Sequence, residues 1–277
     1  MALSLCIAAA ADTETSEGSG NCRAMYLNLG GMPGVSWRGG EFANVAARLN
    51  QMAKATVREL QQRQQTVFPQ KNNSNGNGNS SNASSTYTVP STRQLLERIQ
   101  LSSVLNEEDL FELLAGKLQK QMARHKGHIK ILILDSIADL YRGGGAYGGG
   151  AVEAKAQLFH IAALLKKLSH QFQVPVLVIN QVVAVVQSKQ NVVGTRLSSI
   201  LPLPRDGLKP ALGLSWANCV NTSYLTSRKE IFSNLSYNIG RASRFERSLS
   251  LYKASHTACC QSASFCIQEA GVFLLKP

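Results

Sequence analysis

The sequence predicts an α/β fold built on a mainly parallel sheet. Two runs, Ile131–Ser136 and Val174–Gln181, are apolar at nearly every position and then end in polar residues. A strand without polar alternation suits a parallel sheet that is covered on both faces. Helical patterns at 107–124 and 151–171 precede the two runs, and this alternation of helix and strand is typical of βαβ units.

Length and charge limit the classes of protein to consider. The chain has 277 residues, a formal charge of +12 and a pI near 9.6. This length suffices for a substantial core, and the positive charge favours a polyanionic partner, with nucleic acid ahead of a membrane. No apolar run is long enough to span a bilayer. The six cysteines contain no Cys-x-x-Cys pair, which favours reduced thiols in an intracellular protein.

The first third of the chain contains two expected helices around one expected strand. Residues 1–11 predict a buried helix; a secretory signal is the alternative, but a basic n-region is lacking. A short strand is expected at 24–29, ended by Gly30 and Gly31. Apolar residues at helical spacing then predict a helix over 42–65.

Low complexity marks the next segment. Residues 71–85 are almost purely Asn, Ser and Gly, so we expect a disordered surface insertion at about 66–88 within one domain, 1–277. A short amphipathic piece follows at 94–99. The helix over 107–124 ends in basic residues, which complement its dipole.

The last part combines loops and strands. A glycine loop is expected at 141–150, and the irregular stretch 187–209 is long enough to be functional or disordered. Strands are expected at 217–227 and 249–254, and a terminal hairpin at 265–275.

The polar ends of the two apolar strands suggest nucleotide chemistry. Asp135 ends one strand at the edge where open α/β sheets bind ligands, and a carboxylate there can hold Mg²⁺ through water. Gln181 ends the other strand, and its amide can both donate to a phosphate and accept from water. A core strand that merely ends in a capping Asp remains the alternative interpretation.

Three segments resemble a known family. ILILDS, VPVLVINQV and KPALGLSWANCVNTSYLTSR, read with the loops and helix between them, resemble the RecA-like ATPase core of the eukaryotic recombinase and its DNA-repair paralogues. The run Pro210–Asn218 and the turn Glu269–Val272 are similar to one repair branch of that family. The resemblance implies a RecA-like P-loop ATPase core with a mainly parallel central sheet.

The resemblance also implies roles for individual residues. Asp135 would be the Walker B carboxylate that holds Mg²⁺, and with Ser136 and Gln181 it would bind ATP. Gln181 would link the nucleotide state to DNA. Two DNA-facing loops, 141–150 and 182–209, would supply basic side chains for phosphates, namely Arg142, Lys189, Arg196, Arg205 and Lys209.

The departures from the family concern catalysis. The sequence contains no Gly-x-x-x-x-Gly-Lys-Ser/Thr phosphate loop, and Gly116-Lys117 lies within an expected helix. Residues 1–11 resemble the helix that follows this loop, so we expect a core truncated at its N-terminus. Gly30 stands where the family carries its catalytic glutamate. Hydrolysis by this chain alone is therefore not expected, whether through truncation or through a paralogue's loss of catalysis.

The resemblance implies a nuclear DNA-repair protein of homologous recombination. It would bind single-stranded or branched DNA in an ATP-dependent way, pair with a second recombinase paralogue, and assist recombinase filaments and junction processing, without a membrane. One alternative is a catalytically inert interaction subunit that binds its partner through an open sheet edge. An unrelated doubly wound enzyme is the other, but the sequence lacks both Gly-x-Gly-x-x-Gly after a strand and Gly-x-Ser-x-Gly.

Overall fold

The computed structural model describes residues 1–12, 23–30, 41–67, 89–141, 151–184, 208–231, 244–259 and 261–275. Most of the expected insertion, the glycine loop after Tyr141 and residues 185–207 lie outside these ranges. No described helix combines the length and apolar composition that crossing a bilayer requires.

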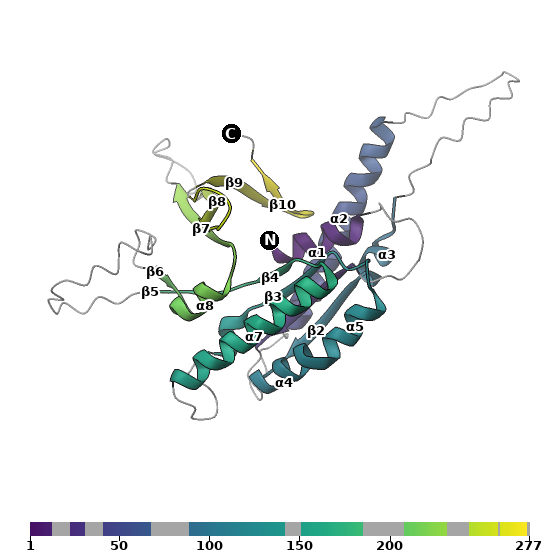
Figure 1. The fold of residues 1–277 in the computed structure, drawn as a ribbon. Helices are drawn as coiled ribbons and strands as arrows, with labels where there is room; N and C mark the ends of the chain where they lie inside the picture. Colours follow the sequence, from purple (N-terminus) through teal and green to yellow (C-terminus); the bar gives the residue numbers. More distant parts are fainter. Residues whose placement is uncertain are drawn as a thin grey trace, which may run out of the picture.

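Four parallel strands form the central sheet (Figure 1). In sheet order they are β2 (Ile99–Val104), β1 (Ala24–Leu29), β3 (Ile131–Asp135) and β4 (Val176–Val178). Every neighbouring pair is parallel, and the register sets Asn28 of β1 beside Asp135 of β3. The predicted mainly parallel sheet is confirmed.

Helices cover both faces of this sheet, which explains why β3 is apolar from Ile131 to Leu134. Ile133 packs in the cluster that contains residues of the first three helices, whereas Leu132 and Leu134 pack in the cluster on the opposite face. The first three helices are α1 (Ala2–Ala11), α2 (Glu41–Val67) and α3 (Thr92–Glu97). The opposite cluster contains residues of α4 (Glu107–Glu112), α5 (Leu118–Arg124) and α7 (Ala151–Phe172). Burial of each aliphatic side chain, relative to leaving it exposed, stabilises the fold by about 1.5–3 kcal/mol.

The expected helix at 107–124 is confirmed, with a π-helical turn at Leu113–Lys117 joining α4 to α5. Four residues spaced four apart form its buried stripe: Leu110, Leu114, Leu118 and Met122. A spacing of four drifts around a regular α-helix of 3.6 residues per turn. The wider π turn reduces this drift, so the stripe stays against the sheet.

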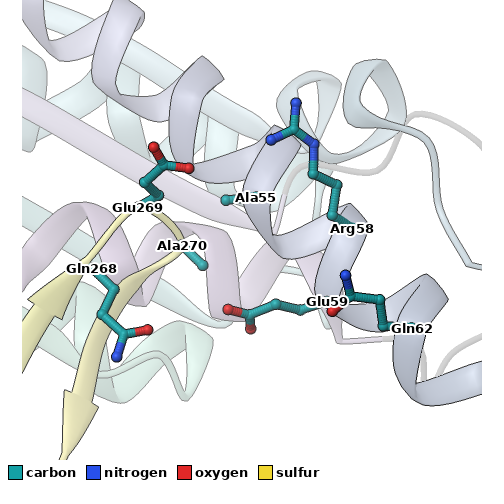
Figure 2. Close-up of a pocket in the computed structure, with 7 residues that line it drawn as sticks. All are labelled: Ala55, Arg58, Glu59, Gln62, Gln268, Glu269 and Ala270. Atoms are coloured by element: carbon teal, nitrogen blue, oxygen red, sulfur yellow. The ribbon is translucent and has the colours of Figure 1, made fainter. Parts of the chain in front are cut away.

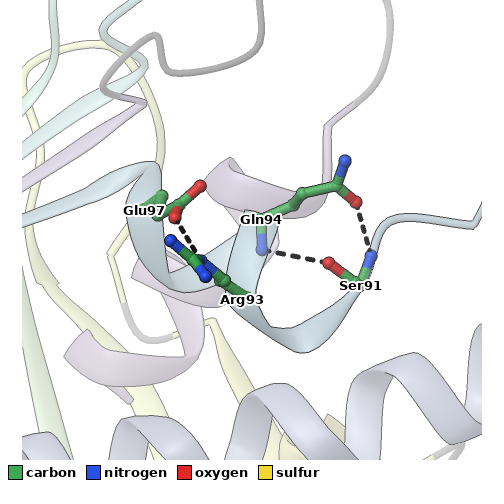
Figure 3. Close-up of polar contacts among 4 residues, drawn as sticks. All are labelled: Ser91, Arg93, Gln94 and Glu97. Atoms are coloured by element: carbon green, nitrogen blue, oxygen red, sulfur yellow. Dashed lines mark hydrogen bonds and ion pairs between the residues drawn. The ribbon is translucent and has the colours of Figure 1, made fainter.

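The segment around 94–99 contains more structure than the sequence indicated. Ser91 begins α3 with a capping box: its Oγ accepts from Gln94 N at 3.2 Å, and Gln94 Oε1 accepts from Ser91 N at 2.8 Å (Figure 3). This arrangement satisfies two backbone donors at the start of the helix. The chain then continues as β2, a strand that sequence analysis did not predict.

The C-terminal part is an antiparallel sheet in the order β10-β9-β8-β7. Its strands are β7 (Ser223–Ile231), β8 (Arg244–Lys253), β9 (Ser262–Gln268) and β10 (Gly271–Leu274). The predicted strand at 217–227 is wrong at its start, because Ala217–Cys219 end the helix α8 (Gly213–Cys219). Trp216 and Cys219 of this helix are buried in the main core. The expected terminal hairpin is confirmed as β9 and β10.

Side-chain contacts join this sheet to the rest of the molecule. Arg48 of α2 donates from Nη2 to the carbonyl oxygen of Gln268 at 2.8 Å. Gly271 has a φ of +142°, and a Cβ added there would lie 3.0 Å from Ser4 Oγ of α1. Lys253 Nζ donates to the carbonyl oxygens of Ala217 at 2.5 Å and Val220 at 3.2 Å, which ties β8 to the end of α8.

Candidate functional site

Asp135 lies at the carboxyl end of β3 with one oxygen held by the neighbouring strand. The hydroxyl of Tyr26 in β1 donates to Asp135 Oδ2 at 2.5 Å. Tyr26 is only 2% exposed, and its burial, reinforced by the bond to Asp135, raises its pKa far above the usual range. The tyrosine is therefore a permanent donor, and it fixes the position of the half-buried carboxylate.

Three polar side chains form a closed network directly after Asp135. The Asp135–Ser136 peptide bond is cis, and the short helix α6 (Ile137–Leu140) follows it. Ser136 Oγ donates to Asp139 Oδ2 at 2.5 Å. Gln181, beyond the end of β4, donates from Nε2 to Asp139 Oδ1 at 2.7 Å and to Ser136 Oγ at 3.0 Å. The network thus connects the ends of two adjacent strands.

Gly30 leaves the space that Asp139 occupies. It follows β1 with a φ of +94°, and its amide donates to the carbonyl oxygen of Val104 at 3.0 Å. A Cβ at this position would lie 2.6 Å from the Cβ of Asp139, closer than non-bonded carbon atoms approach in proteins. The position where the resemblance implies a glutamate is therefore filled from α6 by another carboxylate.

Asp139 is a site residue that sequence analysis missed. The available signals were a carboxylate one helical turn after Ser136 and a glycine at the end of the preceding parallel strand. Neither signal indicates on its own that the two residues touch, because their contact depends on the pairing of β1 with β3.

The structure brings together the three predicted nucleotide residues. Ser136 contacts Gln181 directly, and Asp135 is joined to Ser136 through the backbone. Among the predicted DNA-binding residues, Lys209 is described and exposed. The other four lie outside the described residues: Arg142, Lys189, Arg196 and Arg205.

A two-stranded ribbon connects Gln181 to Lys209. The backbone oxygen of Gln181 accepts from the amide of Ala211 at 2.8 Å. The chain then enters β5 (Val182–Ala184), which pairs antiparallel with β6 (Leu208–Pro210) and places Val183 opposite Lys209. The ribbon therefore frames residues 185–207, the larger part of the predicted second DNA-facing loop.

The oxygen donors at this edge fit Mg²⁺ in only one binding mode. The described residues contain no group of three His, Cys, Asp or Glu side chains that could hold a metal ion. Magnesium is usually bound through one or two carboxylates, several waters and the substrate phosphates. Asp135 and Ser136 suit that mode, but the sequence has no phosphate loop to hold the phosphates beside them.

A separate pocket lies between α2 and the turn that joins β9 to β10. Its volume is about 330 Å³. Figure 2 shows Arg58 and Glu59 on the helix and Glu269 on the turn around it. None of its lining residues is a predicted site residue.

Comparisons with known proteins show which family this chain resembles. The Rad51 family model matches residues 81–198, a range that begins before α3 and includes β2, β3, β4 and Gln181. The chain is also 32% identical over 105 residues to the DNA repair protein XRCC3 homolog of Arabidopsis thaliana. Over these ranges the chain is similar to RecA-like recombinase paralogues. The family match and the parallel order of the central sheet confirm the predicted α/β core.

Further similarities give the extent of the match. The chain is 33% identical over 131 residues to DNA repair protein XRCC3 of Mus musculus, covering 45% of this chain and 35% of the mouse protein. The Arabidopsis alignment covers 37% of this chain and 34% of that protein. The chain thus spans about a third of the length of the curated relatives that it matches. The crystal structure of the RadB recombinase aligns with a TM-score of 0.49 and 16% identity, covering 92% of this chain and 79% of that chain.

Proposed function

We propose that this protein is a recombinase paralogue, a nuclear DNA-repair protein of homologous recombination. It binds single-stranded or branched DNA, together with a second paralogue as a heterodimer, and assists recombinase filaments and junction processing. ATP and Mg²⁺ are its cofactors in that complex. Asp135 and Ser136 would hold the metal through water, and Gln181 would report the nucleotide to the DNA-facing loop.

One observation carries the proposal. Gln181 bonds to Ser136, the residue directly after Asp135, and its own backbone begins the ribbon that bears Lys209. Gln181 therefore connects the candidate metal site, through the ribbon, to Lys209, a candidate DNA contact. The formal charge of +12 and the Rad51 family match agree with a polyanionic partner.

Oligonucleotide binding at several salt concentrations tests this function. We expect fluorescence anisotropy to show affinity that falls as salt rises, because phosphate contacts release counterions. Lys209→Ala should weaken binding to all sequences alike and reduce the salt slope by about one. Lys120→Ala, an exposed lysine on α5, is the matched control and should leave the slope unchanged. Absence of salt-sensitive binding, by the chain alone and with a paralogue, would refute the proposal.

A catalytically inert interaction subunit is the second candidate, and a specific observation favours it. Tyr26 already bonds one oxygen of Asp135, and the side chain of Asp139 fills the space beside Gly30. Side chains of the protein itself thus already engage the groups at the edge of the sheet where a nucleotide would bind. This candidate predicts that DNA binding appears only in a heterodimer and that Asp135→Ala hardly changes ATP affinity. Strong ATP binding by the isolated chain would contradict it.

A further inference from the structure

The side-chain amide of Gln181 has no N–H group left for a ligand. A primary amide carries two N–H donors. Here Nε2 donates to Asp139 Oδ1 at 2.7 Å and to Ser136 Oγ at 3.0 Å, so both donors are used inside the chain. An incoming phosphate oxygen, which only accepts hydrogen bonds, would have to displace one of these acceptors.

The orientation of this amide follows from its neighbours. If it were turned over, Oε1 would face Asp139 Oδ1, and two acceptors would meet without a hydrogen between them. In the observed orientation Oε1 is buried and has no hydrogen-bond partner among the described residues. The hydrogen bond from Gln181 to the carboxylate of Asp139 therefore offsets the cost of leaving Oε1 unsatisfied, because a bond to a charged acceptor is stronger than one between neutral groups.

We propose that the carboxylate of Asp139 is an internal anionic partner of Gln181 that takes the place of a nucleotide's terminal phosphate. The inference rests on the proposed switch role of Gln181 and specifies how that switch is set in this chain. The β5–β6 ribbon is then held without nucleotide. A nucleotide that arrives with a partner subunit competes with Asp139 for the same N–H groups.

Gly30 provides the space that the contact between Asp139 and Gln181 requires. The Cβ of Asp139 lies 2.6 Å from the point where a side chain at position 30 would begin, so only glycine allows the carboxylate to reach Gln181. A larger residue at position 30 would push α6 away from the end of β4. Gly30 and Asp139 are therefore a matched pair, one providing the space and the other the charge.

The contact between Asp139 and Gln181 is connected to the β5–β6 ribbon through the backbone oxygen of Gln181. Gln181 holds Asp139 with its side chain and accepts from the amide of Ala211 with its backbone oxygen. Val182 follows immediately and pairs with Pro210. If Asp139 releases the side chain of Gln181, the backbone of Gln181 at the start of the ribbon is also less restrained. The hydrogen-exchange rate of the Ala211 amide therefore reports on the contact between Asp139 and Gln181.

Hydrogen exchange of the nucleotide-free chain tests this inference. In Asp139→Ala the amide of Ala211 should exchange about tenfold faster than in the wild type, because a charged hydrogen bond that limits local opening is gone. Amides of β1 should exchange at an unchanged rate. Asp109→Ala removes an exposed carboxylate from α4 and is the matched control, for which no change at Ala211 is expected.

A conservative variant covers the case in which Asp139→Ala does not fold. Asp139→Asn keeps the volume beside Gly30 and removes the charge, so exchange at Ala211 should lie between the wild type and Asp139→Ala. Wild-type exchange in whichever of the two variants folds would overturn the inference. Oligonucleotide binding is measured separately: its absence would refute the proposed function, whereas faster exchange at Ala211 would still support the contact between Asp139 and Gln181.

Discussion

The hydroxyl of Tyr26 and the carboxylate of Asp135 are joined by a hydrogen bond of 2.5 Å that links β1 to β3 at the carboxyl edge of the central sheet. Tyr26 is deeply buried, whereas Asp135 is half-buried and reaches the surface. The same bond therefore connects the buried core around Tyr26 to Asp135, and it restricts the position of this candidate metal ligand.

A double-mutant cycle should show that the two residues are coupled. Asp135→Ala leaves the Tyr26 hydroxyl buried without an acceptor, which should cost about 1–3 kcal/mol of unfolding free energy. The double variant Tyr26→Phe/Asp135→Ala should lose less than the sum of the single variants, because neither polar group is then left unpaired. Urea denaturation of all four proteins measures the coupling. Additive losses would show that the bond contributes nothing to stability.

Alkaline pH should destabilise the protein through three tyrosines, of which Tyr26 is buried and Tyr141 and Tyr252 are half-buried. Burial raises the pKa of Tyr26, Tyr141 and Tyr252 above the ordinary value. Above a pH of about 10 the unfolded chain loses these protons while the folded chain keeps them, so stability falls as pH rises, by at most about 1.4 kcal/mol per pH unit for each proton. The stability conferred by these groups is fully present below that pH.

Tyr26→Phe provides the control for this pH dependence. Its unfolding free energy, measured by urea denaturation between pH 8 and about 11, should fall less steeply above a pH of about 10 than that of the wild type. Identical slopes in the two proteins would assign the alkaline loss to other groups.

Lys253 should stabilise the end of α8. Its ammonium group donates to two carbonyl oxygens at the C-terminus of that helix, where a positive charge also interacts favourably with the helix dipole. Lys253→Met should lower the unfolding free energy by about 1–2 kcal/mol. Lys229→Met, at an exposed position in β7, should change it by less than about 0.5 kcal/mol. Equal effects in the two variants would contradict a capping role for Lys253.

The capping box of α3 should matter more than its surface ion pair. Ser91→Ala removes the side-chain acceptor at the N-terminus of the helix and should cost about 0.5–2 kcal/mol. Arg93→Ala breaks an ion pair between exposed side chains and should have little effect (Figure 3). Thermal unfolding of both variants compares them, and a larger loss for Arg93→Ala would contradict this ranking.

The buried centre of the fold could be predicted because its strands carry a strong local signal. The unbroken apolar run from Ile131 to Leu134 in β3 reflects burial on both faces, and the helical patterns on either side of it in the sequence indicated parallel pairing. Asp135 and Gln181 could be assigned to one edge for the same reason, since parallel strands end on the same side.

Elements that depend on distant partners could not be predicted in the same way. β2 lies at the edge of the sheet and carries Gln100, Ser102 and Ser103, so its pattern lacks a continuous apolar run. α8 is short, and its helical state depends on the burial of Trp216 and on Lys253 from another strand. The contact of Asp139 with Gly30 requires two segments more than a hundred residues apart in the chain.

The π-helical turn between α4 and α5 makes the length of this segment adjustable. Removing one residue from Leu113–Lys117 would tighten the turn to ordinary α-helix and leave apolar residues at spacings of three and four on the buried side. Such a deletion would shorten the connection between β2 and β3 without shifting the register of either strand. A chain one residue shorter here would still place the carboxylate of Asp135 at the end of β3.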